Sequence, residues 1–64
     1  MIAREALEIL EFARPLVQYH KSKGNIKKYE MWRLLRKTIR RMDPNAQVKE
    51  DTARVIEKEF GGFK

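Results

Sequence analysis

The stretch that decides the fold runs from Ile26 to Met42 and reads IKKYEMWRLLRKTIRRM. Its apolar residues recur at spacings of three and four, which is the period of an α-helix with one buried side. We expect this face to carry Met31, Leu34, Leu35, Thr38, Ile39 and Met42, with Trp32 at its edge. Just before it, the side chain of Asn25 can accept a hydrogen bond from the first free backbone N–H groups. The pattern therefore predicts a helix over residues 26–42, capped by Asn25.

The opposite face of the same helix is strongly basic. It is expected to carry Arg33, Arg36, Lys37, Arg40 and Arg41. Arg36 and Arg40, about one turn apart, should both point away from the apolar face. Residues 20–42 hold nine Lys or Arg against a single acid, Glu30, for a net charge of +8, while the whole protein carries +6. This concentration of charge is typical of a surface that binds a polyanion.

The basic face favours nucleic acid as the partner. Guanidinium groups hold phosphates with paired hydrogen bonds, and each neutralised phosphate releases counterions. The predicted nucleic-acid-binding residues are Lys27, Lys28, Arg33, Arg36, Lys37, Arg40 and Arg41, with Lys21, Lys23 and Lys49 as secondary contacts. None of them is Asn or Gln, so hydrogen bonding to bases would depend on Arg alone. We therefore expect weakly sequence-specific or architectural binding, with DNA favoured over RNA.

Two other interpretations of the basic face remain open. A protein-interaction module or small regulator would present it to an acidic protein partner, and its apolar faces would make the closest contact. Alternatively, the face is only solvated. The neighbouring aromatic residues are ambiguous too, because Trp32 and Tyr29 could stack on bases. A lone Trp beside Leu35 and Met31 is more often an anchor in the core or in an interface, and that is the role we predict.

A second amphipathic segment covers residues 2–22. Its apolar side chains recur with helical spacing and include Ile2, Ala6, Ile9, Ala13, Leu16 and Val17. Pro15 interrupts the segment, because it has no N–H to donate to the carbonyl of Glu11. Either the helix bends there or a new helix begins with Pro15 in its first turn. We predict one helix kinked at Pro15, since the apolar pattern continues through it in phase.

Turn-forming residues separate the predicted helices. Gly24 can adopt a left-handed backbone conformation after a helix C-terminus, and Asn25 can begin the next helix. The sequence Asp43-Pro44-Asn45 predicts a turn, because Pro fixes φ and Asp and Asn side chains bond to nearby backbone groups. The chain between these turns is therefore expected to be a single uninterrupted helix.

The last helix is expected over residues 49–60. Its apolar side would consist of Val48, Thr52, Val55, Ile56 and Phe60. Gly61-Gly62 should end it, and Phe63 can fold back over its last turn. These segments together predict an all-α fold, a compact domain of three helices that spans residues 1–64.

The length of the chain limits the stability of a monomer. A chain of 64 residues buries only roughly 60% of the surface that it exposes when unfolded. There is no cysteine, so neither a disulfide nor a thiolate metal site can add stability, and His20 is the only histidine. No cofactor or metal is expected. The many large apolar residues cannot all be buried comfortably in one copy, so we expect a homodimer with the first helix at its interface.

Several classes of protein are not expected. Glu5, Glu8 and Glu11 interrupt the apolar stretch that a signal peptide would need, and no segment is apolar enough to span a membrane. We therefore expect a cytoplasmic or nucleoid-associated location. An enzyme is not expected, because His20 and Ser22 have no orienting acid close to them in the sequence.

Residues 27–60 resemble the first part of a histone fold. In that family, an opening helix with a Tyr and a Leu-x-Lys-x-(Val/Ile) run leads through a Pro-containing loop into the central helix. The matching residues here are Tyr29, Leu35, Lys37, Ile39, Pro44 and Val48. The resemblance implies DNA contacts at the end of the opening helix and in the loop. These contacts would be made by Arg40, Arg41, Asn45 and Lys49.

Overall fold

Four helices make up the part of the chain that the computed structural model describes, residues 1–61. They are α1 (Ala3–Phe12), α2 (Arg14–Ser22), α3 (Ile26–Arg40) and α4 (Glu50–Phe60). These residues form no strand, so the prediction of a compact, mostly helical domain is confirmed. The predicted number of three helices is wrong, since the segment expected to be one helix is two.

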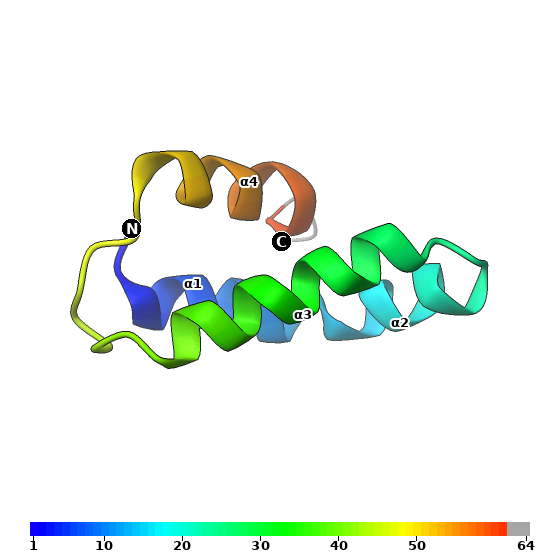
Figure 1. The fold of residues 1–64 in the computed structure, drawn as a ribbon, viewed down its shortest axis with the longest axis horizontal. Helices are drawn as coiled ribbons and strands as arrows, with labels where there is room; N and C mark the ends of the chain where they lie inside the picture. The colour runs from blue at the N-terminus through cyan, green and yellow to red at the C-terminus, as the bar shows by residue number, and fades with distance from the viewer. Residues whose placement is uncertain (62–64) are drawn as a thin grey trace.

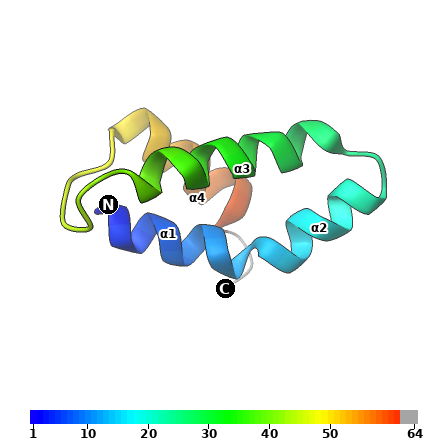
Figure 2. The ribbon, with the colours of Figure 1, turned by 60° about the horizontal axis from the view of Figure 1, so that its bottom comes forward.

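Three helices form a long layer, and the fourth helix packs on it (Figure 1). α1 and α2 follow one another, and α3 runs back along both of them (Figures 1 and 2). α4 packs on α1. The start of α1 and the end of α4 therefore both lie on the side of α3 that faces α4 (Figure 1). The molecule is therefore elongated, with extents of 34 × 22 × 18 Å.

The division between α1 and α2 falls at Ala13. Pro15 lies in the first turn of α2, where its missing N–H costs no regular helical bond. The helical path still continues across the junction, because Ala13 N–H donates to Ile9 and Val17 N–H donates to Ala13, both at 3.0 Å. The prediction of one helix kinked at Pro15 is thus corrected to two helices that meet at an angle (Figure 2).

Small side chains on α1 allow the other helices to approach it closely. Ala3, Ala6 and Ala13 are fully buried. They pack with larger residues from every helix, and the rest of the buried core consists of Ile9, Leu10, Val17, Trp32, Ile39, Val48, Ile56 and Phe60. Each buried aliphatic side chain of this size contributes roughly 1.5–3 kcal/mol by leaving water. The core is therefore centred on α1, and α2, α3 and α4 each contribute side chains to it.

The buried side of α3 is rotated relative to the prediction. Trp32 and Ile39 are buried, whereas Leu34 is 67% exposed and Met31 is 40% exposed. The indole N–H of Trp32 donates to the backbone carbonyl of Leu10 at 2.7 Å. A buried indole needs such an acceptor, and that carbonyl lies in the last turn of α1, where the carbonyl groups of a helix lack regular partners. The placement of Leu34 and Met31 on the buried face, with Trp32 at its edge, is therefore wrong.

The loop between α3 and α4 closes over the start of α1. The carbonyl groups of Ala46 and Pro44 accept from the N–H groups of Ala3 (2.9 Å) and Arg4 (3.0 Å). The first N–H groups of a helix have no partner within it, so the loop caps α1. Asn45 N–H bonds to the side chain of Asp43 at 2.9 Å, which confirms the predicted turn.

The helix ends agree with the predicted turn chemistry. Gly24 has φ of +91°, and the side chain of Asn25 accepts from Lys28 N–H at 3.4 Å, so both predictions are confirmed. α3 ends at Arg40 and α4 begins at Glu50, slightly inside the predicted ranges. The predicted roles of Gly62 and Phe63 lie outside the described residues. Between residues 1 and 61, no helix combines the length and apolar character needed to cross a membrane.

Candidate nucleic-acid interface

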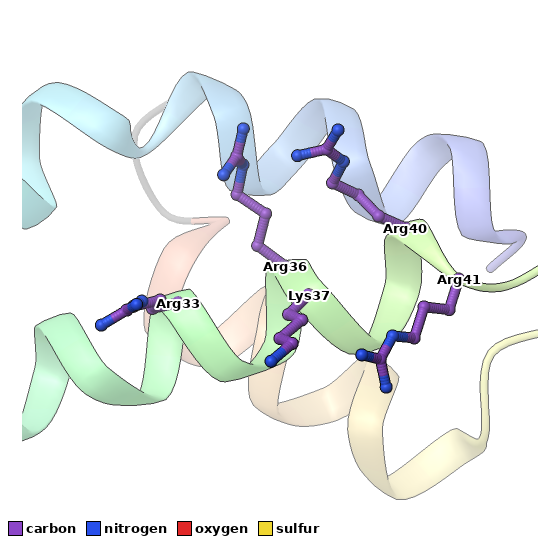
Figure 3. A pocket seen from close by; sticks show the side chains of 5 residues that line it. All are labelled: Arg33, Arg36, Lys37, Arg40 and Arg41. Atoms are coloured by element: carbon purple, nitrogen blue, oxygen red, sulfur yellow. The ribbon is translucent and has the colours of Figure 1, made fainter.

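The second half of α3 and the residue that follows it carry five basic side chains around one shallow hollow. The hollow has a volume of about 420 Å³ and is lined by Arg33, Arg36, Lys37, Arg40 and Arg41; we call it the basic hollow. Figure 3 shows that Arg36 and Arg40 point towards the side of α1, while Lys37 and Arg41 point the other way. The structure thus brings together five of the seven residues predicted as principal contacts, on two rows of one helix.

Four of the five cations are available to a ligand. Arg33, Lys37, Arg40 and Arg41 are exposed, and none of them makes an ion pair within residues 1–61. Like charges at helical spacing repel one another, which costs a few tenths of a kcal/mol per pair. A bound anion would remove that repulsion, so the arrangement favours a negatively charged ligand.

Arg36 is held differently from the other four. Its Nε donates to the carboxylate of Glu11 on α1, and its guanidinium lies 5.6 Å from the centre of the Trp32 ring. Its side chain is only 28% exposed. The prediction that Arg36 points away from the apolar face is therefore wrong. Arg36 links α3 to α1 and forms one edge of the basic hollow.

Arg14, the first residue of α2, contacts the same two residues as Arg36, namely Glu11 and Trp32. Its Nη2 donates to Glu11 at 2.9 Å, and its guanidinium lies 5.7 Å from the centre of the Trp32 ring. The hydrogen bond from Arg36 is the main reason that the pKa of Glu11 lies below its usual value. Burial opposes it as the second-largest effect, and the charges of Arg36 and Arg14 and the hydrogen bond from Arg14 lower the pKa further. Glu11 is thus a carboxylate at neutral pH, and it balances part of the charge of the two arginines.

The sequence predicts part of this link. Glu11 and Arg14 are three residues apart in a helical segment, so they were expected to pair, and the structure confirms this pair. The partnership with Arg36 could not be read in the same way, because Arg36 lies 25 residues further along the chain. Only the packing of α3 against α1 and α2 brings these side chains together.

The remaining predicted contacts lie away from the basic hollow. Lys28 is half-buried, and its Nζ is 3.8 Å from a carboxylate oxygen of Glu59. Lys27 is exposed in the first turn of α3, about 20 Å along the helix from its C-terminal end. The structure therefore does not group these two lysines with the five residues of the hollow.

The secondary lysines also belong to other parts of the surface. The Nζ of Lys21 lies 4.3 Å from the centre of the Tyr29 ring, and that of Lys23 lies 5.6 Å from the centre of the Tyr19 ring. Lys49 is exposed just before α4. None of the three lines the basic hollow.

The aromatic residues of α3 are not placed to stack on bases. Trp32 is 4% exposed, and the guanidinium groups of Arg14 and Arg36 lie 5.7 Å and 5.6 Å from the centre of its ring. Tyr29 is half-buried, with Lys21 over its ring. The prediction that Trp32 is a core anchor is confirmed, so recognition through this surface would depend on charge.

No cluster of three or more His, Asp or Glu side chains that could hold a metal ion occurs in the described part of the chain. No protein-family model matches this chain, and no curated protein or solved structure matches it with significance. The histone-fold resemblance of residues 27–60 accordingly stays a prediction.

Proposed function

We propose that this protein binds nucleic acid through α3, holding the phosphates of duplex DNA with little preference for sequence. The observation that carries the proposal is the basic hollow, where four exposed cations without an ion pair in the described structure surround one surface depression. Guanidinium groups suit this task because they donate paired hydrogen bonds in a fixed plane that matches a phosphate.

The geometry suits contacts with the backbone of the duplex more than with its bases. The five residues stand on two rows, and within a row the side chains are about 6 Å apart along the helix axis. Arg is the only residue of the basic hollow with a fork suited to guanine, and the hollow contains no Asn or Gln for adenine. Binding should thus be weakly sequence-specific or architectural.

The dependence of affinity on salt tests the proposal directly. If Arg33, Lys37, Arg40 and Arg41 each neutralise one phosphate, log affinity should fall against log salt with a slope of about −3.6 on B-DNA. We would measure it by fluorescence anisotropy with labelled duplexes of several sequences, and with an RNA hairpin for comparison. The affinity should differ little between the duplex sequences.

A pair of double variants separates the basic hollow from the overall charge. Replacing Arg33 and Arg40 by Ala should reduce the magnitude of the slope by about 1.8, because two phosphate contacts are lost. Replacing Arg54 and Lys58 by Ala removes the same charge from exposed positions on α4 and should change the slope by less than half as much. Equal effects of the two double variants, or no binding by the unmodified protein, would refute the proposal.

An acidic protein is the second candidate partner, and one observation favours it. A neighbouring hollow of about 380 Å³ is lined by Glu30, Arg33, Leu34 and Lys37, and Leu34 is 67% exposed within it. An apolar side chain beside cations suits a segment with both apolar and acidic residues. In that case, Leu34→Ser should abolish partner binding, whereas it should barely change the affinity for duplex DNA.

A further inference from the structure

An exposed apolar surface crosses the junction of α1 and α2. It consists of Phe12, Pro15, Leu16 and Tyr19, and we call it the junction patch. Phe12 is 60% exposed and Tyr19 is 56% exposed, and the four residues line a hollow of about 640 Å³ together with Glu11. Isolated apolar side chains are common on protein surfaces, but two large aromatic residues around one apolar hollow mark a contact surface.

The continuity of the helical path explains why these residues share one side. The bonds from Ala13 to Ile9 and from Val17 to Ala13 carry the helical register across the break. Residues spaced by three and four positions then lie on one face. The core uses Ile9, Ala13 and Val17 on one side of this segment, which leaves the junction patch on another side, where no helix of residues 1–61 covers it.

Along the sequence, residues of the same chemical kind lie at equal distances from the midpoint of the patch. Its midpoint falls between Pro15 and Leu16, and Phe12 and Tyr19 lie at equal distances on either side. If a second copy lies antiparallel across this midpoint, Phe12 meets Tyr19 of the second copy and Pro15 meets Leu16 of the second copy. The contact between Phe12 and Tyr19 then occurs twice, once in each half of a two-fold interface.

The charges beyond the apolar centre select the same orientation. Glu8 lies one turn before Phe12 on α1, and Lys23, directly after α2, has its Nζ 5.6 Å from the centre of the Tyr19 ring. In the sequence the two residues are again at equal distances from the midpoint. Neither makes an ion pair within the described residues. An antiparallel second copy places Glu8 opposite Lys23, whereas a parallel copy would place like charges together.

From this symmetry and charge complementarity we infer that the junction patch is the interface of a homodimer, with α1–α2 of two copies antiparallel around a two-fold axis at Pro15 and Leu16. α1 and α2 meet at an angle (Figure 2), so the closest contact is at the junction, and Glu8 and Lys23 lie at the rim of the interface. The contact is then smaller than the roughly 800 Å² per partner of a standard interface. We therefore expect a dissociation constant in the micromolar range.

The dimer is independent of the proposed function, because no residue of the basic hollow belongs to the junction patch. A dimer would present two basic hollows, which would raise the apparent affinity for a long duplex through the effective concentration of the second site. If the protein does not dimerise, the salt dependence of its binding to a short duplex should be unchanged.

The oligomeric state in sedimentation experiments tests the inference. The unmodified chain should change from monomer to dimer between about 5 and about 500 μM, where a micromolar equilibrium shifts. Tyr19→Ser should remove the dimer, because it replaces one ring in each half of the interface. Leu34→Ser, at the most exposed of the large apolar residues, is the matched control and should leave it unchanged.

A charge exchange tests the orientation. Glu8→Lys or Lys23→Glu alone should weaken the dimer about tenfold or less, and the two changes combined should restore it, since each ion pair is re-formed with reversed signs. Circular dichroism would confirm that every variant keeps its helices. A monomer at all concentrations, loss of the dimer in Leu34→Ser but not in Tyr19→Ser, or no rescue in the double variant would overturn the inference.

Discussion

Arg36 and Arg40 stand one turn apart on α3, yet the structure assigns them different tasks. Arg36 is bound to Glu11 and packs over Trp32, while Arg40 is exposed and makes no ion pair within residues 1–61. Replacing each of them by Ala should therefore separate stability from binding. Arg36→Ala should destabilise the fold, and Arg40→Ala should weaken the binding of phosphate.

The contacts of Arg36 set the size of the first effect. A partly exposed ion pair contributes about 0.2–1 kcal/mol, and a cation over an aromatic ring contributes about 0.5–1 kcal/mol. The two share one side chain, so we expect a loss of about 1 kcal/mol in the free energy of unfolding. For a domain of this size, that lowers the melting temperature by roughly 4–8 °C.

The effect of Arg40 should appear in binding alone. An exposed residue without such contacts changes stability by less than about 0.5 kcal/mol when it is truncated. Losing one phosphate contact should reduce the magnitude of the slope of log affinity against log salt by about 0.9. In Arg36→Ala, the slope should change by less than half of that, because its Nε is already engaged by Glu11.

Thermal melting followed by circular dichroism and anisotropy titrations at several salt concentrations would measure both quantities on the same samples. Lys58→Ala, a single charge removed from α4, is the control for net charge. Equal melting temperatures for the two Arg variants would show that the contacts of Arg36 do not stabilise the fold. Equal slopes would show that Glu11 does not keep Arg36 from the phosphates.

Three further predictions concern the fold that holds the hollow in place. Trp32→Phe should lower the free energy of unfolding by about 1–3 kcal/mol, because the Leu10 carbonyl loses its buried donor, and urea unfolding would show it. The pKa of Glu11 is lowered from its usual 4.5, so its pairing stabilises the protein above that pH and is lost as the pH falls through the lowered value. Unfolding at a series of pH values should therefore show a smaller acid-induced loss in Glu11→Gln than in the unmodified chain. Gly24→Ala should cost about 1 kcal/mol, because φ is +91° there although the space around it is open, and a melting temperature equal to that of the unmodified protein would contradict this.

Much of the local structure could be predicted because it depends on neighbours in the sequence. The helix after Asn25, the left-handed Gly24 and the turn at Asp43 each follow from the chemistry of a few adjacent residues, and the structure agrees with all three. The gathering of cations on α3 was predictable for the same reason, since the helical period alone places them on one face.

The sequence by itself determined which residues could share a face, and the tertiary structure decided which face is covered. The apolar residues of α3 span a wide arc that includes both Trp32 and Leu34. Periodicity cannot choose between them, because either could face a neighbouring helix. Trp32 is the buried one because its N–H donates to the Leu10 carbonyl of α1, and the guanidinium groups of Arg14 on α2 and Arg36 on α3 lie near its ring. That rotation leaves Leu34 exposed and turns Arg36 towards Glu11, a contact between distant parts of the chain that exists only once α3 has packed against α1.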